Sequence, residues 1–173
     1  FYYGQAFRQY DFPGCKTSDL ALTIQHSPYK LYLDEDRTRP RSGTAYCMRK
    51  GKDRPIQHDL TDSILIDGKS HEEAAEIFKR VKTFISYDLW TAYSRFASLA
   101  GCDSVVMPQA GMSKQDWAPE ASSRMGIAYG FDDLDEARRT RADLVAYYLD
   151  SDRAGMEMAQ AFMAEADAFF AQA

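Results

Sequence analysis

Two polar clusters in the sequence have residue types suited to binding an anionic ligand. The first lies in residues 84–91, where an apolar run passes into a turn that carries hydroxyl groups and one carboxylate. Its candidate binding residues are Ser86, Tyr87, Asp88 and Thr91. Asp88 can accept hydrogen bonds from a polyol. Thr91 can meet a phosphate oxygen, because the free amides at a helix N-terminus favour negative charge.

The second cluster is the basic run of residues 48–52, which places Arg49 and Lys50 at the end of another predicted strand. These two side-chain types are suited to clamping a diphosphate. Ligands of open parallel sheets bind beyond the carboxyl ends of the strands, so we expect both clusters at one edge of a sheet. Two simpler interpretations stay open. Asp88 is a preferred helix N-cap residue, and a basic run is often only a solvated surface.

Other familiar chemistries lack their motifs. No Gly-x-Gly-x-x-Gly follows a strand, and no Gly-x-Ser-x-Gly marks a hydrolase. The run Gly68-Lys69-Ser70 ends like a phosphate-binding loop, but Ser63 stands where that loop requires a glycine. The histidines lack the spacing of a helical metal pair: His26, His58 and His71. We therefore expect no metal and no other cofactor.

Strand and helix signals alternate through the middle of the chain. Short apolar runs predict strands at residues 45–50, 63–67, 83–87 and 104–108. Ser70 and Glu73 form a capping box that begins a helix over residues 70–82. A second helix covers residues 91–100 and stops at Gly101. This alternation predicts an α/β fold, with a Rossmann-like parallel sheet flanked by helices.

The N-terminal part of the chain has a different pattern. Apolar residues alternate through residues 18–41 on both sides of Ser27-Pro28, which predicts a hairpin or two short edge strands. Residues 34–41 are highly charged and predict a solvated loop. That loop divides a short β-rich segment at residues 1–41 from a Rossmann-like domain at residues 42–173.

The C-terminal third is predicted to be helical. One helix begins at the acidic run that starts with Asp133, and a second begins near Ser151. The second helix carries an apolar stripe of Met158, Phe162 and Phe169, which must cover another part of the protein.

Length and composition limit the class of protein. The chain has 173 residues, of which 45% are hydrophobic and 27% charged, as in a single domain with its own core. The net charge of −5 argues against binding of nucleic acid or anionic lipid through a broad basic surface. The three cysteines form no Cys-x-x-Cys pair, which is typical of a reducing cytoplasm. No apolar run approaches the about 20 residues that a transmembrane helix needs. The chain lacks an initiator Met and starts with aromatic residues, so we expect a piece of a longer protein.

The order of motifs between residues 42 and 106 resembles the nucleotide-sugar-binding half of GT-B fold glycosyltransferases. In that half a first strand ends in a basic pair, and a Glu-rich helix precedes a strand whose loop reaches the donor. A further helix then leads into a Val-Val strand. The corresponding pieces here are Arg49-Lys50, residues 70–82, residues 84–88, Ser98-Leu99-Ala100-Gly101 and Ser104-Val105-Val106.

The resemblance implies roles for individual residues. Arg49 and Lys50 would face the donor diphosphate, and the backbone amides of residues 89–91 would face its phosphates. Many retaining members carry two glutamates eight positions apart. Asp88 stands at the first of these positions and Phe96 at the second, so the ribose must be recognised in another way. Thr91 stands where members usually carry a glycine.

The resemblance thus predicts a glycosyltransferase domain that binds a nucleoside-diphosphate sugar for polysaccharide or surface glycan assembly, without a metal. We expect the acceptor and catalytic groups to involve an N-terminal acceptor-binding domain that this chain lacks. The expected location is cytoplasmic, either free or peripheral at the inner face of the membrane. The alternative is a noncatalytic α/β domain that binds a small anionic ligand or a protein partner. In the first case Arg49 and Asp88 both affect nucleotide binding, and in the second neither does.

Overall fold

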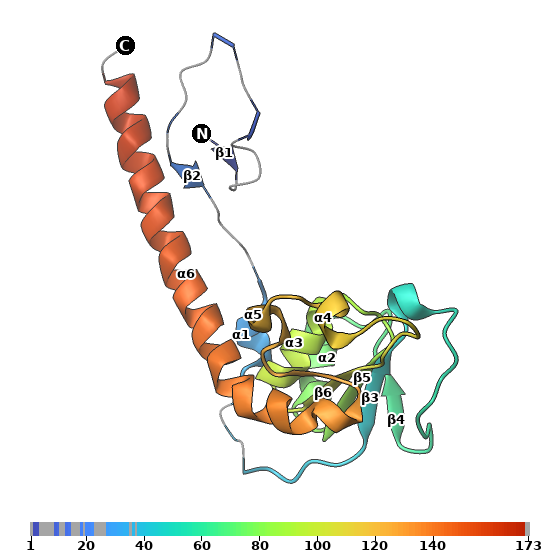
Figure 1. Ribbon diagram of the computed structural model, residues 1–173. Helices are drawn as coiled ribbons and strands as arrows, with labels where there is room; N and C mark the ends of the chain where they lie inside the picture. Colours follow the sequence, from blue (N-terminus) through green and yellow to red (C-terminus); the bar gives the residue numbers. More distant parts are fainter. Residues whose placement is uncertain are drawn as a thin grey trace. The chain divides into compact units, whose positions relative to one another are not determined.

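The computed structural model describes residues 2–3, 9–10, 13–14, 18, 20–22, 27–34, 36 and 38–171 (Figure 1). The chain divides into two compact units. The sheet unit consists of Pro28–Ala146, and the terminal unit consists of Phe1–Ser27 together with Tyr147–Ala173. The site lies entirely in the sheet unit.

The sheet unit is built on five strands that are all parallel, in the order β4-β3-β5-β6-β7 (Figure 1). The strands are β3 (Thr44–Cys47), β4 (Ser63–Leu65), β5 (Thr83–Ser86), β6 (Asp103–Val106) and β7 (Ile127–Tyr129). In this register Ala45 pairs with Ile64 on one side and with Phe84 on the other. The predicted α/β fold with a Rossmann-like parallel sheet is confirmed. The four expected strands are present, and β7 is a fifth that the apolar runs did not indicate.

In the described part of the chain the α-helices are α1 (Tyr29–Tyr32), α2 (His71–Phe78), α3 (Ala92–Leu99), α4 (Lys114–Trp117), α5 (Ala121–Arg124) and α6 (Leu134–Phe170). The sheet unit also contains the short 3-10 turns η2 (Arg49–Gly51) and η3 (Phe131–Asp133).

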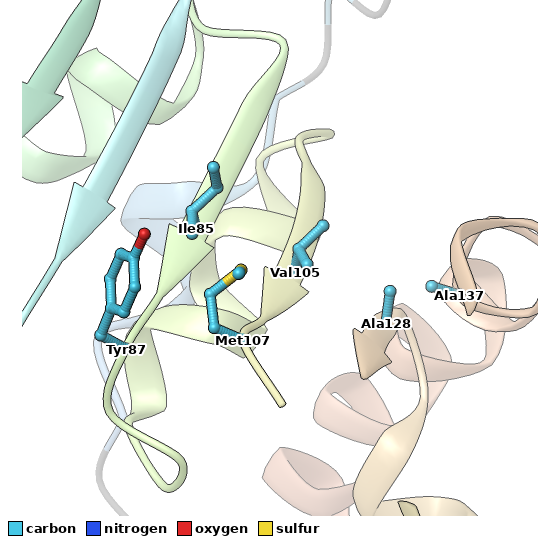
Figure 2. Close-up of a cluster of buried hydrophobic side chains, with 6 residues drawn as sticks. All are labelled: Ile85, Tyr87, Val105, Met107, Ala128 and Ala137. Carbon is cyan, nitrogen blue, oxygen red and sulfur yellow. The ribbon is translucent and has the colours of Figure 1, made fainter. Parts of the chain in front are cut away.

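Helices cover both faces of the sheet. Neighbouring residues of a strand point to opposite sides, so Phe84 and Ile85 of β5 lie on different faces. Phe84 packs against Phe78 of α2, with ring centroids 4.9 Å apart. The next residue, Ile85, belongs to a buried cluster that includes Ala128 of β7 and Ala137 of α6 (Figure 2). The side chains of β5 therefore contribute to two apolar layers, one on each face of the sheet.

Local capping explains where α2 and α3 begin. Ser70 Oγ accepts the Glu73 backbone N–H at 3.2 Å, and Glu73 Oε2 accepts the Ser70 backbone N–H at 2.8 Å. This reciprocal pair is the predicted capping box. Thr91 is the N-cap residue of α3, and its Oγ1 accepts the Tyr93 backbone N–H at 3.3 Å.

The second edge strand predicted between residues 18 and 41 is wrong. Residues Tyr29–Tyr32 form α1, and the Tyr32 ring is fully buried, stacked on Phe96 at 4.5 Å. The packing of Tyr32 on Phe96 of α3, which is distant in the sequence, stabilises a helix here, although the apolar residues alternate as they do in a strand. The sheet unit consequently begins at Pro28, ahead of the expected boundary at residue 42. In the terminal unit, β1 (Tyr2–Tyr3) and β2 (Ala21–Leu22) form a parallel pair.

Within the charged run of residues 34–41, the described residues 36 and 38–40 are exposed as predicted, whereas the two ends of the run pack against the protein. Asp34 is buried and Arg41 is mostly buried, and they form an ion pair at 2.5 Å. Arg41 also donates to the carbonyls of Phe78 at 2.7 Å and Ala100 at 2.5 Å. These carbonyls lie at the C-terminal ends of α2 and α3, where helices leave acceptors unsatisfied, so Arg41 ties both helix ends together.

The separate helix predicted from Ser151 is wrong, because α6 continues without a break from Leu134 to Phe170. Gly155 is accommodated inside the helix, and no atom lies within 4 Å of the position that a Cβ would take. Met158 and Phe162 are half-buried, whereas Phe169 is 45% exposed. None of the helices in the described residues has an apolar stretch long enough to cross a membrane.

Candidate functional site

A pocket of about 290 Å³ lies at the carboxyl ends of β3 and β5. It is lined by Arg49, Lys50, His71, Asp88, Trp90, Thr91, Ala92, Tyr93 and Phe96. From β3 the chain passes to β4 on one side and then returns to β5 on the other side. The pocket therefore lies where the strand order reverses, which is the usual ligand crevice of doubly wound sheets.

The turn after β3 presents the basic residues in a fixed conformation. Asp67 Oδ2 accepts the backbone N–H groups of Met48 at 3.2 Å and Arg49 at 2.9 Å. Arg49 adopts the left-handed conformation, with φ +42°. Gly51 packs tightly against the turn that follows β5, because a Cβ at this position would lie only 2.1 Å from the Tyr87 carbonyl oxygen. The basic turn is thus attached to both neighbouring strand ends.

Asp88 is the acidic group of the pocket, and its side chain is almost fully buried. Its Oδ1 accepts the Trp90 backbone N–H at 3.1 Å, and its Oδ2 lies 3.9 Å from Arg49 Nε. The Arg49 guanidinium carbon also lies 5.2 Å from the centre of the Tyr93 ring. Since Thr91 is the N-cap of α3, Asp88 stabilises the preceding turn instead of capping the helix.

Four of the six predicted binding residues line this pocket: Arg49, Lys50, Asp88 and Thr91. Ser86 and Tyr87 are buried and do not line it. Ser86 Oγ donates to the Asp88 carbonyl oxygen at 2.6 Å, which shapes the turn. Tyr87 points its hydroxyl at the other side of β5, where it accepts the Gln57 backbone N–H at 2.7 Å. The side chains of these two residues therefore contact other parts of the protein and do not face this pocket.

The Tyr87 hydroxyl is also part of a small polar network outside the pocket lining. It lies 2.9 Å from His58 Nδ1, and His58 Nε2 lies 3.0 Å from Ser63 Oγ. Partial burial lowers the pKa of His58, which favours the neutral ring. His58 therefore connects the loop before β4 to the end of β5.

The pocket also contains residues that were not predicted from the sequence: His71, Trp90, Ala92, Tyr93 and Phe96. Trp90 is 62% exposed, although its Nε1–H donates to the Trp117 carbonyl at 3.2 Å. Its place between Asp88 and Thr91 was a usable signal, since an aromatic residue beside a binding turn often contacts the ligand. His71 offered a weaker signal, because only its position after a helix cap distinguished it.

A second, more open hollow of about 510 Å³ adjoins the same turn and is lined by Arg49, Lys50, Lys52, Asp67 and Gly68. Arg49 and Lys50 line both hollows. The basic cluster therefore serves one continuous edge of the sheet. Within the described part of the chain, no group of three or more His, Cys, Asp or Glu side chains is arranged to hold a metal ion.

No family model, no curated protein and no solved structure matches this chain. The arrangement of side chains around the pocket is consequently the basis for assigning a function.

Proposed function

We propose that this chain is the donor-binding part of a glycosyltransferase and that the pocket holds the diphosphate and sugar of a nucleoside-diphosphate sugar. The observation that carries the proposal is the convergence of Arg49, Lys50 and Asp88 on one pocket at the point where the strand order reverses. A ligand with both negative charge and hydroxyl groups would use both kinds of side chain.

The basic side of the pocket suits the diphosphate. Arg49 and Lys50 supply cationic donors, and residues of the first turn of α3 line the same pocket. Helix N-termini add a partial positive charge that stabilises phosphate. These groups would also stabilise the charge that develops on a departing nucleoside diphosphate, with no bound metal required.

The acidic side suits a hydroxylated ring. Among the described residues, Asp88 Oδ2 has only the distant Arg49 Nε at 3.9 Å, so it keeps capacity to accept hydrogen bonds from a ligand. A phosphate alone would be repelled by this carboxylate. A sugar attached to a diphosphate places its hydroxyl groups beside Asp88 and its charge beside Arg49.

The rest of the reaction belongs to other parts of such an enzyme. An N-terminal domain would bind the acceptor, and polysaccharide or surface glycan assembly on the cytoplasmic side is the process that fits the proposal. The chain by itself would bind the donor without transferring the sugar. Ligand measurements identify the base and the sugar of the donor.

A noncatalytic α/β domain that binds a small anion is the second candidate. The observation in its favour is that Asp88 already has partners in the Trp90 amide and the Arg49 guanidinium. Such a pair can stabilise the turn with no sugar present.

Calorimetry with UDP, GDP and dTDP and their sugar derivatives tests the proposal. One nucleotide should bind, and Arg49→Ala should weaken it about 10- to 100-fold, the usual effect of losing a hydrogen bond to a charged group. Arg139→Ala is the matched control, because Arg139 is an exposed arginine of α6 outside the pocket. Equal binding by both variants, or no nucleotide binding at millimolar concentration, would contradict the proposal.

A further inference from the structure

His71 and Tyr32 form a hydrogen-bonded pair at the edge of the pocket. The Tyr32 hydroxyl oxygen lies 2.6 Å from His71 Nδ1. Tyr32 belongs to α1, whereas His71 is the first residue of α2 and lines the pocket. The two residues are 39 positions apart in the sequence, so only the packing of α1 on α2 brings them together.

Tyr32 is held rigidly. Its side chain is fully buried, and its ring stacks on Phe96 at 4.5 Å and packs on Phe78 at 5.9 Å. Phe96 also lines the pocket, so the layer of rings forms the support behind His71. A rigid support fixes the direction of the hydroxyl group.

The chemistry of this contact determines where the imidazole carries its proton. A buried hydroxyl proton needs an acceptor, since leaving it unpaired is energetically costly. Within the described residues, His71 Nδ1 is the only hydrogen-bond partner of the Tyr32 hydroxyl. If Tyr32 donates, Nδ1 must accept, and the neutral ring must carry its hydrogen on Nε2. Burial raises the pKa of Tyr32 well above its ordinary value, so the hydroxyl keeps this proton.

His71 lies close to the basic side of the pocket. Its ring centroid is 5.6 Å from that of Tyr93, and the Arg49 guanidinium carbon lies 5.2 Å from the same Tyr93 ring. Arg49 and His71 are therefore both in contact with Tyr93. An Nε2–H group here adds a donor to those of Arg49 and Lys50.

We propose that His71 is a further binding residue of this pocket, which donates an Nε2–H hydrogen bond to a phosphate oxygen of the ligand, and that Tyr32 is the positioning residue that fixes this tautomer. The inference rests on the proposed anion-binding function of the pocket. It adds a specific class of ligand atom, a phosphate oxygen, at the side of the pocket where His71 of α2 lies.

Nuclear magnetic resonance of the imidazole nitrogens tests the role of Tyr32. In the unmodified chain the His71 ring should be the Nε2–H tautomer, and in Tyr32→Phe it should become a mixture of both tautomers. The ring of His58 is the internal control, because its contacts with Tyr87 and Ser63 do not involve Tyr32. Similar tautomer populations in both proteins would overturn the role of Tyr32.

Calorimetry with inorganic pyrophosphate and with UDP, GDP and dTDP tests the role of His71. His71→Ala should weaken pyrophosphate and nucleotide binding about 10-fold or more, as expected for a lost hydrogen bond to a charged group. His71→Gln should retain most of the affinity, because its amide supplies an N–H group. Glu76→Gln is the control, since Glu76 is an exposed residue of α2 outside the pocket.

The outcomes separate this inference from the proposed function. If a nucleotide binds equally well to His71→Ala, the inference is overturned and the donor site stands. If pyrophosphate binds through His71 but no nucleotide binds, the inference stands and the glycosyltransferase function is overturned. If neither probe binds the unmodified chain, both are overturned.

Discussion

Arg49 Nε lies 3.9 Å from Asp88 Oδ2, so the turns that follow two adjacent strands, β3 and β5, place opposite charges against each other. The pair is asymmetric, because the Asp88 side chain is 3% exposed and the Arg49 side chain is 47% exposed. Arg49 can therefore turn toward a ligand, whereas Asp88 is fixed by the turn. An anion bound in the pocket, as proposed, would compete with Asp88 for the same guanidinium group.

Asp88→Asn should separate charge effects from sugar recognition. The asparagine keeps an oxygen for the Trp90 amide, but it no longer attracts Arg49. Pyrophosphate should bind a few-fold tighter, because a nearby negative charge is removed. The preference for a sugar nucleotide over its free nucleotide should fall, because an amide accepts fewer hydrogen bonds than a carboxylate. Competitive calorimetry measures both effects.

The stability of the fold should change little in the same variant. The partly exposed ion pair contributes at most about 1 kcal/mol, which salt reduces further. Asp132→Asn, at an exposed position outside the pocket, is the control for net charge. Weaker pyrophosphate binding in Asp88→Asn would contradict the competition between Asp88 and the anion.

Gly51→Ala should destabilise the sheet unit strongly. The added Cβ would lie 2.1 Å from the Tyr87 carbonyl oxygen and 2.6 Å from its carbonyl carbon, so the backbone of one of the two turns must move. Changes that force a backbone shift in a packed region cost about 1–3 kcal/mol or more. Urea unfolding followed by circular dichroism measures the loss.

Gly155→Ala is the matched control for this substitution. Gly155 lies inside α6 with open space around its Cβ position, and alanine is favoured over glycine in a helix by about 0.8–1.0 kcal/mol. Its helix content should be equal or higher. A Gly51→Ala protein as stable as the unmodified chain would show that the close approach of the two turns is wrong.

Asp103 should make the free energy of unfolding depend on pH in the acid range. Arg138 donates to both carboxylate oxygens, at 2.6 and 3.0 Å, and Arg141 lies 3.3 Å away. The hydrogen bonds from Arg138 hold the pKa of Asp103 below its ordinary value. Because the folded pKa is the lower one, this contribution is present above the unfolded pKa of about 4 and is lost as the pH falls through the folded pKa.

Asp103→Asn should therefore be less stable than the unmodified chain at about pH 7, and the difference should shrink below about pH 4. Urea unfolding at several pH values measures it. Asp135→Asn is the control, because Asp135 also contacts Arg138 at 3.4 Å but is fully exposed. A difference for Asp103→Asn that stays constant down to about pH 2 would contradict the assigned role.

Cys47 and Cys102 should react slowly with iodoacetamide in the folded protein. Both are buried, and burial raises the pKa of Cys47 to about 11 and of Cys102 to about 12. The reactive thiolate is consequently scarce near neutral pH. Mass spectrometry of a Cys15→Ser protein, with and without urea, measures the reaction of these two thiols alone. Equally fast labelling in both conditions would contradict their burial.

Local signals in the sequence located much of the sheet unit. The capping box of Ser70 and Glu73 depends on residues three positions apart, so the start of α2 could be read directly. The convergence of Arg49 and Asp88 was also predictable, because the carboxyl ends of parallel strands share one edge. The direction of Ser86 and Tyr87 was not, since side chains alternate between faces and the end of a strand is difficult to locate within one residue.

The amino-acid sequence by itself determined the α/β alternation and the edge of the sheet that carries Arg49, Lys50, Asp88 and Thr91, because short-range periodicity and capping encode strands and helix starts. Only the tertiary structure decided that residues Tyr29–Tyr32 form a helix and that Tyr32 meets His71. It also decided that α6 continues past Ser151. These features arise from packing between distant segments, and no local pattern specifies which distant segment a side chain will meet.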